Sequence, residues 1–435
     1  MVRPPEGNKG AVNSHLTEDI MEKKKAYSNR FIQVNAGIVG PCAPKPKTVA
    51  YKNIGDYPQT PQAFLDVAKN YSNPLVIGPP ICDELVNLVQ HMFTEEEARL
   101  VRHLRPYPLG KTAEKVAKKE HRPVEEVRRL LEHLATEKRV ILRHGMGGGK
   151  KGYDILPIVP GTFEMALMRT SLDTLTEWHK TFAVLFEELW ETGFLTDFLS
   201  FPNPAVRYLP VMKSISALPV AWPSDKLAEV LDRYDMFGVG LCQCRMTEKI
   251  VERECGRPME NCTAFGRAAL PLIKAGMMRQ VERQEIIDIK AEAEASGLVS
   301  WMFNEESGKG PAGSCSCCGC CCHMMRTVSE FNMPGMIAPP HFLPEFDSMS
   351  CDYCGKCARA CPMGAITIDT KTKGVHHDAQ RCVGCGLCAL ACNKNSSVRM
   401  VEVPGYKKPP SGWMSLIAGL APNMARNAWK AWRTR

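Results

Sequence analysis

One cysteine spacing, present twice near the carboxyl end, constrains this chain more than any other feature. The segments "CDYCGKCARACPMGAITID" and "CVGCGLCALAC" each follow the pattern C-x2-C-x2-C-x3-C. Two-residue gaps let a tight loop turn three thiolates toward one point, while the fourth cysteine lies past a turn and faces elsewhere. The chain must therefore fold around groups of thiols here. The eight cysteines are Cys351, Cys354, Cys357 and Cys361 in the first motif and Cys382, Cys385, Cys388 and Cys392 in the second.

The doubled spacing resembles that of the bacterial dicluster ferredoxin domain, which holds two [4Fe–4S] clusters. The resemblance implies that the fourth cysteine of each motif binds the cluster of the other motif. One cluster would be bound by Cys351, Cys354, Cys357 and Cys392, and the second by Cys382, Cys385, Cys388 and Cys361. Zinc is the alternative for each four-cysteine set, and the doubled motif argues against it. Asn393 stands where the second motif often has proline, which affects a turn and no ligand.

Ten further cysteines gather in two segments. They are Cys242, Cys244, Cys255 and Cys262 in "LCQCRMTEKIVERECGRPMENCTAFG", and Cys315, Cys317, Cys318, Cys320, Cys321 and Cys322 in "GSCSCCGCCCHMM". Four thiolates can close one cluster site, so these ten are candidate ligands for one or two further iron–sulfur clusters. Neighbouring side chains diverge, so we expect Cys320, Cys321 and Cys322 to divide between ligand and packing roles. Two alternatives stay open: a zinc or other structural metal site, and a thiol–disulfide or non-cubane catalytic centre.

Three further residues have simpler interpretations. Arg245 follows Cys244 directly and either lowers the pKa of adjacent thiols or pairs with a carboxylate. Cys42 and Cys82 are isolated in the sequence and are expected to be ordinary thiols.

A longer resemblance extends from about residue 94 to residue 392. The chain shows "CQCR", "CGRPMENCTAFG", "SGLVSWMFN" and "CSCCGCCC" before the doubled motif. In this order the features resemble a family of iron–sulfur proteins of anaerobic bacteria that also carry a winged-helix region. The resemblance implies electron transfer inside a larger assembly, and it brings no established reaction with it.

The patterns predict a multidomain α+β chain. It would have a mainly helical amino-terminal part with a winged helix, a central small α/β cysteine-rich domain and a carboxyl-terminal ferredoxin-like dicluster domain. The length of 435 residues is sufficient for several buried cores. The expected boundaries are 1–93 for an extended arm and short helices, 94–157 for the winged helix, 158–343 for a helical linker and the cysteine-rich cluster-binding domain, 344–403 for the dicluster domain, and 404–435 for a basic amphipathic tail.

The winged helix is predicted from three helical segments followed by a hairpin. "TEEEARLVRHL" begins with a capping box formed by Thr94 and Glu97. "TAEKVAKKE" and "PVEEVRRLLEHLATEK" continue as helices, and "RVILRHGMGGGKKGYDILP" gives two strands around a glycine-rich tip. Beyond it, apolar residues at three- and four-residue spacing predict one long amphipathic helix over 162–194. Ser224 is expected to cap a later helix.

A nucleic-acid partner is not expected, although the winged helix invites that interpretation. The net charge of +8 is mild for 435 residues. The helix that would enter a DNA groove carries Glu125, Glu126, Glu132 and Glu137, which oppose phosphate. The basic residues that would meet phosphate are Lys115, Lys118, Lys119, Arg128, Arg129, Arg139, Arg143, Lys150 and Lys151.

Location and function follow from the cysteines and from the chain ends. No secretory signal and no long apolar run is present, so we expect a cytoplasmic protein whose clustered thiols bind metal. The tail, with Trp413, Trp429 and Trp432, suits a partner groove or the inner-membrane surface. The favoured function is a non-catalytic electron-transfer subunit. It would serve a flavin, molybdenum or tungsten, or hydrogenase-type partner and a ferredoxin or flavoprotein. The alternatives are an oxidoreductase with its own metal or thiol centre and a redox-sensing regulator.

Overall fold

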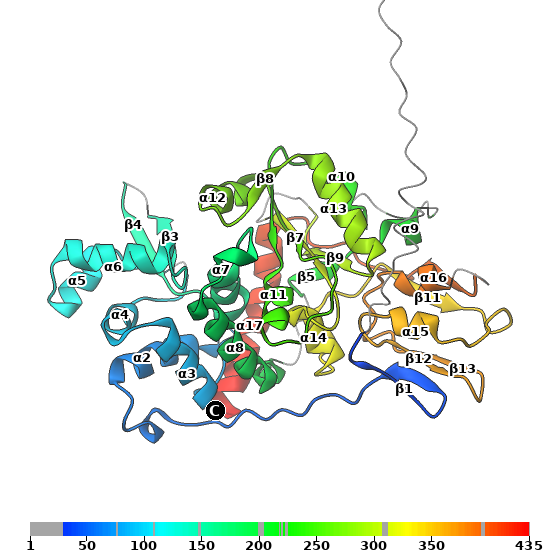
Figure 1. The fold of residues 1–435 in the computed structure, drawn as a ribbon, viewed down its shortest axis with the longest axis horizontal. Helices are drawn as coiled ribbons and strands as arrows, with labels where there is room; N and C mark the ends of the chain where they lie inside the picture. Colours follow the sequence, from blue (N-terminus) through cyan, green and yellow to red (C-terminus); the bar gives the residue numbers. More distant parts are fainter. Residues whose placement is uncertain are drawn as a thin grey trace, which may run out of the picture.

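The computed structural model has three regions along its longest axis: a helical region, a central sheet and a domain around the doubled motif (Figure 1). It is a mixed α/β, multidomain arrangement. Ser224 and Asn393 lie outside the described residues, as do the first 28 residues. The structure describes residues 29–434 except 75–76, 108, 147–148, 199–203, 217, 219–220, 222–224, 307–311 and 393–395.

In the helical region, two helices are followed by three further helices and a hairpin within residues 94–157. The hydroxyl of Thr94 accepts a hydrogen bond from the Glu97 N–H at 3.2 Å, and the Thr94 N–H donates to the Glu97 carboxylate at 2.8 Å. This reciprocal cap fixes where the first of the three helices begins. The elements are α2 (Gln62–Tyr71), α3 (Asp83–Met92), α4 (Glu95–Val101), α5 (Ala113–Glu120), α6 (Val124–Thr136), β3 (Leu142–Gly145) and β4 (Lys151–Asp154).

The single long helix predicted over 162–194 is wrong. The segment forms α7 (Phe163–Leu167) and α8 (Glu177–Glu191), with an irregular stretch between them. Arg169 explains the break, because its buried guanidinium donates to the carbonyl groups of Ala166, Leu167 and Thr174. Those carbonyls are satisfied by a side chain where helix continuation would have used backbone N–H groups. Thr176 then caps the second helix.

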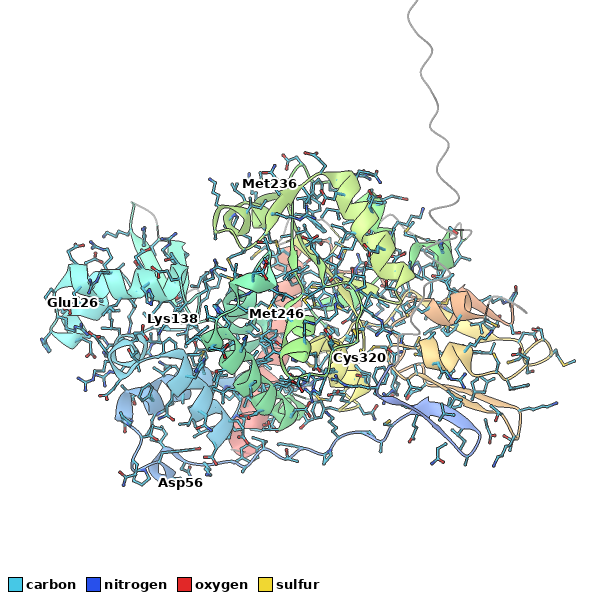
Figure 2. All side chains as sticks on the ribbon, in the orientation of Figure 1. Asp56, Glu126, Lys138, Met236, Met246 and Cys320 are labelled. Atoms are coloured by element: carbon cyan, nitrogen blue, oxygen red, sulfur yellow. The ribbon has the colours of Figure 1, made fainter. Side chains whose placement is uncertain are left out.

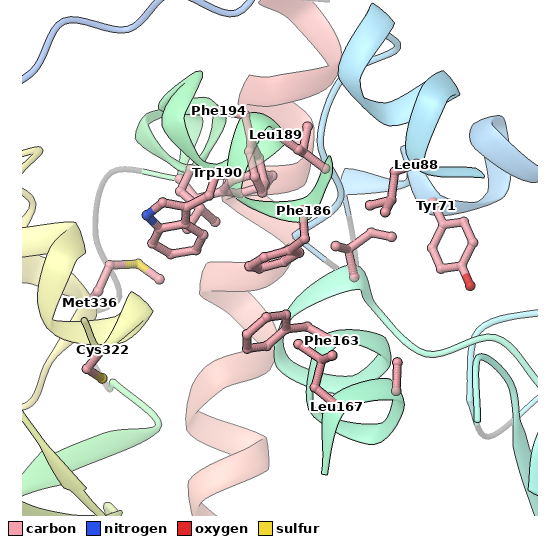
Figure 3. Packing of buried hydrophobic residues seen from close by; sticks show 14 of the residues in the cluster. Tyr71, Leu88, Phe163, Leu167, Phe186, Leu189, Trp190, Phe194, Cys322 and Met336 are labelled. Atoms are coloured by element: carbon pink, nitrogen blue, oxygen red, sulfur yellow. The ribbon is translucent and has the colours of Figure 1, made fainter. Parts of the chain in front are cut away.

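Stacked aromatic rings form the core between the helical region and the sheet (Figure 3). The ring centroids of Phe163 and Phe186 lie 4.0 Å apart. The tail forms one helix, α17 (Trp413–Thr434), which passes through this core (Figures 1 and 3). Leu416 and Leu420 are buried in it, so the tail packs against its own chain. None of the helices among the described residues is both long and apolar enough to cross a bilayer.

The central sheet is antiparallel throughout and supports the cysteine-rich segments. Its strands lie in the order β5 (Val206–Tyr208), β9 (Val299–Phe303), β10 (Ala312–Cys317), β7 (Glu260–Phe265), β6 (Phe237–Leu241) and β8 (Arg279–Val281). The connections around it contain α9 (Met212–Ile215), α10 (Leu227–Leu231), α11 (Gln243–Ile250), α12 (Ala269–Lys274), α13 (Arg283–Ala295) and α14 (His323–Ser329).

The doubled motif lies in a small domain whose sheet includes a hairpin from the amino-terminal segment. β2 pairs with β12, with Val39 opposite Ile368, so the sheet has the order β1-β2-β12-β13. Within β13, His376 is exposed and His377 is partly buried. The elements are β1 (Ile32–Asn35), β2 (Ile38–Pro41), β11 (Phe342–Phe346), α15 (Lys356–Ala360), β12 (Ile366–Asp369), β13 (Gly374–His377), α16 (Leu387–Ala391) and β14 (Val398–Glu402).

Candidate metal centres

The domain around the doubled motif, here called the dicluster region, contains two groups of cysteines. The first group lies near the surface. Cys357 is the second residue of α15 and lies close to Cys351, Cys392 and Cys354. Burial raises the pKa of Cys357 to about 12, and the charges of its three neighbours add to this shift. Cys354 is exposed. The structure therefore brings the last cysteine of the second motif to the first three of the first motif.

The second group lies in the interior and lines a cavity. That cavity is bounded by Cys361, Cys382, Cys385 and Cys388, together with apolar side chains such as Met363. Cys361 comes from the first motif and the other three come from the second. Burial raises the pKa of Cys382 to about 12, with the charge of Cys361 as the next cause. A cavity lined by three buried thiols and one partly buried thiol fits a soft, anionic inorganic cluster better than it fits solvent.

Backbone N–H groups point at several of these sulfurs. The amide of Ala365 lies 3.3 Å from Cys361 Sγ, and that of Gly384 lies 3.4 Å from Cys382 Sγ. Gly384 has φ +65°, and a β-carbon there would lie 2.3 Å from the carbonyl oxygen of Phe342. Glycine is required both for the turn and for the close contact. Such amide–sulfur contacts favour the thiolate form of the ligands.

The ten remaining cysteines separate into two groups. The compact one, here called the four-thiol site, consists of Cys255, Cys318, Cys320 and Cys321. All four sulfur atoms lie within 4.8 Å of one another. The sulfurs of Cys255 and Cys318 are 3.9 Å apart, and those of Cys320 and Cys321 are 3.7 Å apart.

The other six cysteines form a continuous chain of thiol contacts, here called the six-thiol group. In order of contact they are Cys242, Cys244, Cys322, Cys317, Cys315 and Cys262. They come from the end of β6, from α11, from β7, from β10 and from the start of α14. Sequence reasoning expected Cys320, Cys321 and Cys322 to divide between ligands and packing. The structure instead divides them between two thiol groups.

The alternation of a β-strand explains how one short loop serves both groups. Cys315 and Cys317 are two residues apart in β10 and face the six-thiol group. The intervening positions carry serines, and Lys290 of α13 donates to the hydroxyls of Ser314 at 3.1 Å and Ser316 at 3.2 Å. A tight turn follows, in which the Cys322 N–H donates to the Cys318 carbonyl at 3.1 Å. The turn carries the next thiols to the four-thiol site.

Buried cations surround both groups. A guanidinium nitrogen of Arg245 lies 4.0 Å from Cys318 Sγ, and one of Arg257 lies 3.6 Å from Cys320 Sγ. Burial alone would lower the pKa of each arginine, but the neighbouring thiolates hold both above their usual value. Burial lowers the pKa of Lys290 to about 8, and the thiolate of Cys315 opposes that shift. Buried positive charge at these distances requires anionic partners.

Sequence reasoning singled out Arg245 but missed Arg257, Lys290 and the histidine beside the cysteine loop. Arg257 follows Cys255 by two residues, a local signal that was available. His323 follows Cys322 directly, and its Nδ1 lies 3.3 Å from Cys244 Sγ. Its Nε2 lies 3.0 Å from the carboxylate of Glu187, in α8. No local pattern connects Glu187 or Lys290 to the cysteines, because only the fold brings them together.

A network of ion pairs around one arginine supports this histidine. Arg326 is fully buried in α14. It pairs with Glu187 and Glu191 at 2.6 Å and with Glu248 and Glu330 at 2.8 Å. The network joins α8, α11 and α14, the helices that border the six-thiol group.

Two contacts join the cysteine-rich core to the dicluster region (Figure 2 labels Cys320 between the two). A β-carbon on Gly319 would lie 1.7 Å from the carbonyl oxygen of Pro362, so the two backbones touch. On a second side, the Tyr208 hydroxyl lies 3.9 Å from Cys322 Sγ, and the Val211 N–H donates to the Cys385 carbonyl at 2.9 Å. A stretch from Tyr208 to Val211 therefore connects the six-thiol group to the buried dicluster cavity.

The remaining two cysteines lie apart from these groups. Cys82 is fully buried just before α3, and burial raises the pKa of its thiol to about 12. Cys42 is half-buried just after β2. A buried thiol with a raised pKa is inert.

Comparison with known proteins identifies the carboxyl-terminal part. Residues 350–396 match the family model of the 4Fe-4S dicluster domain. Searches of the curated proteins and of the solved structures gave no significant match. The matched region implies iron–sulfur clusters and iron–sulfur electron transfer. The comparisons therefore define the chain as a protein that has a region similar to the 4Fe-4S dicluster domain.

Proposed function

We propose that this chain is an electron-transfer subunit. Its dicluster region relays single electrons between a surface and the cysteine-rich core. One cluster is bound by Cys351, Cys354, Cys357 and Cys392, and the second by Cys382, Cys385, Cys388 and Cys361. The carrying observation is the contrast in depth between the two groups, since Cys354 is exposed whereas Cys361, Cys385 and Cys388 are buried.

The six-thiol group is the proposed internal end of this relay. We propose that it holds a third iron–sulfur cluster, using cysteines among Cys242, Cys244, Cys262, Cys315, Cys317 and Cys322. The stretch from Tyr208 to Val211 supports the route, because it contacts Cys322 at one end and Cys385 at the other. The three peptide units from Tyr208 to Val211 span at most about 10 Å, so the backbone part of this route is short.

The proposed partners follow from the two ends of the relay. A ferredoxin or flavoprotein would exchange electrons at the exposed face around Cys354. A catalytic redox subunit of flavin, molybdenum or tungsten, or hydrogenase type would dock on a different surface of the chain. The thiol content suits an anaerobic, cytoplasmic setting.

Helices α4–α6 and the β3–β4 hairpin form a winged-helix docking module in this proposal. Protein docking is preferred over DNA binding because several of the arginines on this module are already paired with carboxylates. Arg128 pairs with Glu114 at 2.6 Å, and Arg122 pairs with Glu126 at 2.6 Å. Arginines held by carboxylates on the same surface offer little charge to phosphate.

Metal analysis of anaerobically purified protein tests the proposal. We expect about 12 cluster iron atoms, four for each of three clusters, with equal acid-labile sulfide. Cys385→Ser is expected to remove about four of them, with loss of one reduced-cluster signal in electron paramagnetic resonance. Cys42→Ser is the matched control and is expected to change neither. If wild-type protein contains only about eight cluster irons, the proposed third cluster is contradicted. If it contains no iron, the proposed electron-transfer function is overturned.

A second function is favoured by one observation. Six thiols exceed the four that a cubane cluster binds, so the six-thiol group has capacity for chemistry of its own. An oxidoreductase acting there would reduce a disulfide substrate to two thiols, taking two electrons from an external donor and needing no catalytic partner subunit. Steady-state reduction of model disulfides by the purified chain, with dithionite as donor, would favour this alternative over a pure relay.

A further inference from the structure

The four-thiol site differs in size from the other thiol groups. Its sulfurs all lie within 4.8 Å of one another. Within the described part of the chain, no other group of three or more histidine, cysteine, aspartate or glutamate side chains meets that limit. The two cysteine sets of the dicluster region are therefore more open, although each also has four thiols.

This difference in size separates two kinds of metal centre. Four thiolates around one tetrahedral ion, at a metal–sulfur distance of about 2.3 Å, lie about 3.8 Å from one another. A [4Fe–4S] cube places an iron ion between each thiolate and the centre, so its thiolates lie much farther apart. The separations of 3.7 Å for Cys320–Cys321 and 3.9 Å for Cys255–Cys318 match the single ion.

We propose that Cys255, Cys318, Cys320 and Cys321 bind one thiophilic divalent ion, zinc or iron, in a closed tetrahedral site. Tetrahedral sulfur ligation selects these metals. Three of the four cysteines are buried, which leaves no open position for a substrate and suits a structural centre. This site is independent of the proposed relay and goes beyond it.

The surrounding charge supports four thiolates on one divalent ion. Such a centre has a net charge of −2, and Arg245 and Arg257 bring two positive charges to Cys318 and Cys320. Arg245 donates to the Ser316 carbonyl and to the Asn261 side chain, and it forms no ion pair with a carboxylate of the described residues. Four neutral thiols would leave this buried arginine without an anionic partner, at a cost of several kcal/mol.

The position of the site indicates what the ion does. Cys255 lies between α11 and β7, whereas the other three cysteines lie in the turn after β10. An ion bound by both segments fixes that turn. Gly319, within the turn, touches Pro362 of the dicluster region. The ion therefore holds the surface on which the dicluster region rests.

The test counts zinc, iron and acid-labile sulfide per chain in anaerobically purified protein. Cys318→Ser is compared with Cys42→Ser as the matched control. We expect Cys318→Ser to lose one equivalent of zinc or of iron and no sulfide, and Cys42→Ser to lose neither. Loss of about four irons with about four sulfides would show a cube at this site and overturn the proposal. Unchanged metal content would overturn it as well.

Spectroscopy of the wild-type chain keeps the test independent of how the variant folds. For zinc, X-ray absorption is expected to show four sulfurs at about 2.3 Å and no nearby metal. For iron, Mössbauer spectra are expected to show one uncoupled high-spin tetrathiolate site. Wild-type protein with no zinc, and with no iron beyond its sulfide content, contradicts the proposal. The electron-transfer function is judged separately, by the iron that is matched by sulfide.

Discussion

The dicluster region and the cysteine-rich core both gather eight or more thiols, but they do so in opposite ways. In the first, two short motifs supply all eight thiols, and backbone amides such as that of Ala365 approach the sulfurs. In the second, thiols from several strands and helices converge, and full charges such as Arg245 and Arg257 stand beside them. Local geometry is enough for the first arrangement, whereas the second exists only when the whole fold is in place.

This contrast predicts that removing a charged side chain lowers the free energy of unfolding far more in the cysteine-rich core than in the dicluster region. Arg326→Met leaves Glu187, Glu191, Glu248 and Glu330 without their shared partner. We expect the free energy of unfolding to fall by about 3–5 kcal/mol, measured by anaerobic chemical denaturation.

The control for this variant is an ion pair of the dicluster region. Arg399 pairs with Glu345, and both side chains are largely exposed. Arg399→Met is expected to cost less than about 1 kcal/mol. Equal losses in the two variants would contradict the comparison.

The contact between the two regions is the next largest expected effect. Gly319→Ala places a methyl group 1.7 Å from the carbonyl oxygen of Pro362 and must push the backbones apart. We expect a loss of about 3 kcal/mol in unfolding free energy. Slower equilibration of electrons among the clusters should accompany it, measured by stopped-flow reduction. Gly55→Ala is the control, because no atom lies within 4 Å of a β-carbon there. If Gly319→Ala behaves like Gly55→Ala, the contact is unimportant.

A carboxyl group beside this boundary gives the smallest effect and a pH dependence. Glu294 of α13 accepts a hydrogen bond from the Met212 N–H at 3.1 Å, and burial raises its pKa from 4.5 to about 7. Because the folded pKa is raised, the folded state binds the proton more tightly. The contribution of Glu294 to stability is then fully present below pH 4.5 and is lost as the pH rises through about 7.

Glu294→Gln should remove this dependence of the free energy of unfolding on pH. Above pH 7 the variant is expected to be more stable than the wild type by about 2 kcal/mol. Denaturation curves between pH 5 and pH 8 measure the difference. An unchanged slope in the variant would show that Glu294 titrates normally, and Glu285→Gln, on the same helix, is the control.

The same contrast explains what the sequence could predict. The spacing of the doubled motif predicts which cysteines lie together in the dicluster region, and Thr94 with Glu97 predicts the start of α4. Both signals are contained in a few residues. The break between α7 and α8 depends on the three carbonyls that Arg169 reaches, which no periodicity records.

The division of the ten core cysteines was also beyond sequence reasoning. Adjacent residues such as Cys321 and Cys322 enter different groups because a turn reverses the chain between a strand and a helix. The pairing of β10 with β7 then decides which distant cysteines each group receives. Sequence spacing carries no information about that pairing.

The hairpin β1–β2 has a consequence for how this protein is assembled in the cell. Asn29, just before the hairpin, donates to the carbonyl of Arg359, 330 positions later, and Val39 pairs with Ile368. β1 and β2 leave the ribosome early and can pair with each other at once, but β12, the other partner of β2, is made much later. The outer edge of β2 must therefore stay unpaired through most of translation. The sheet of the dicluster region is accordingly completed only when the chain is nearly finished, although its first two strands are among the earliest made.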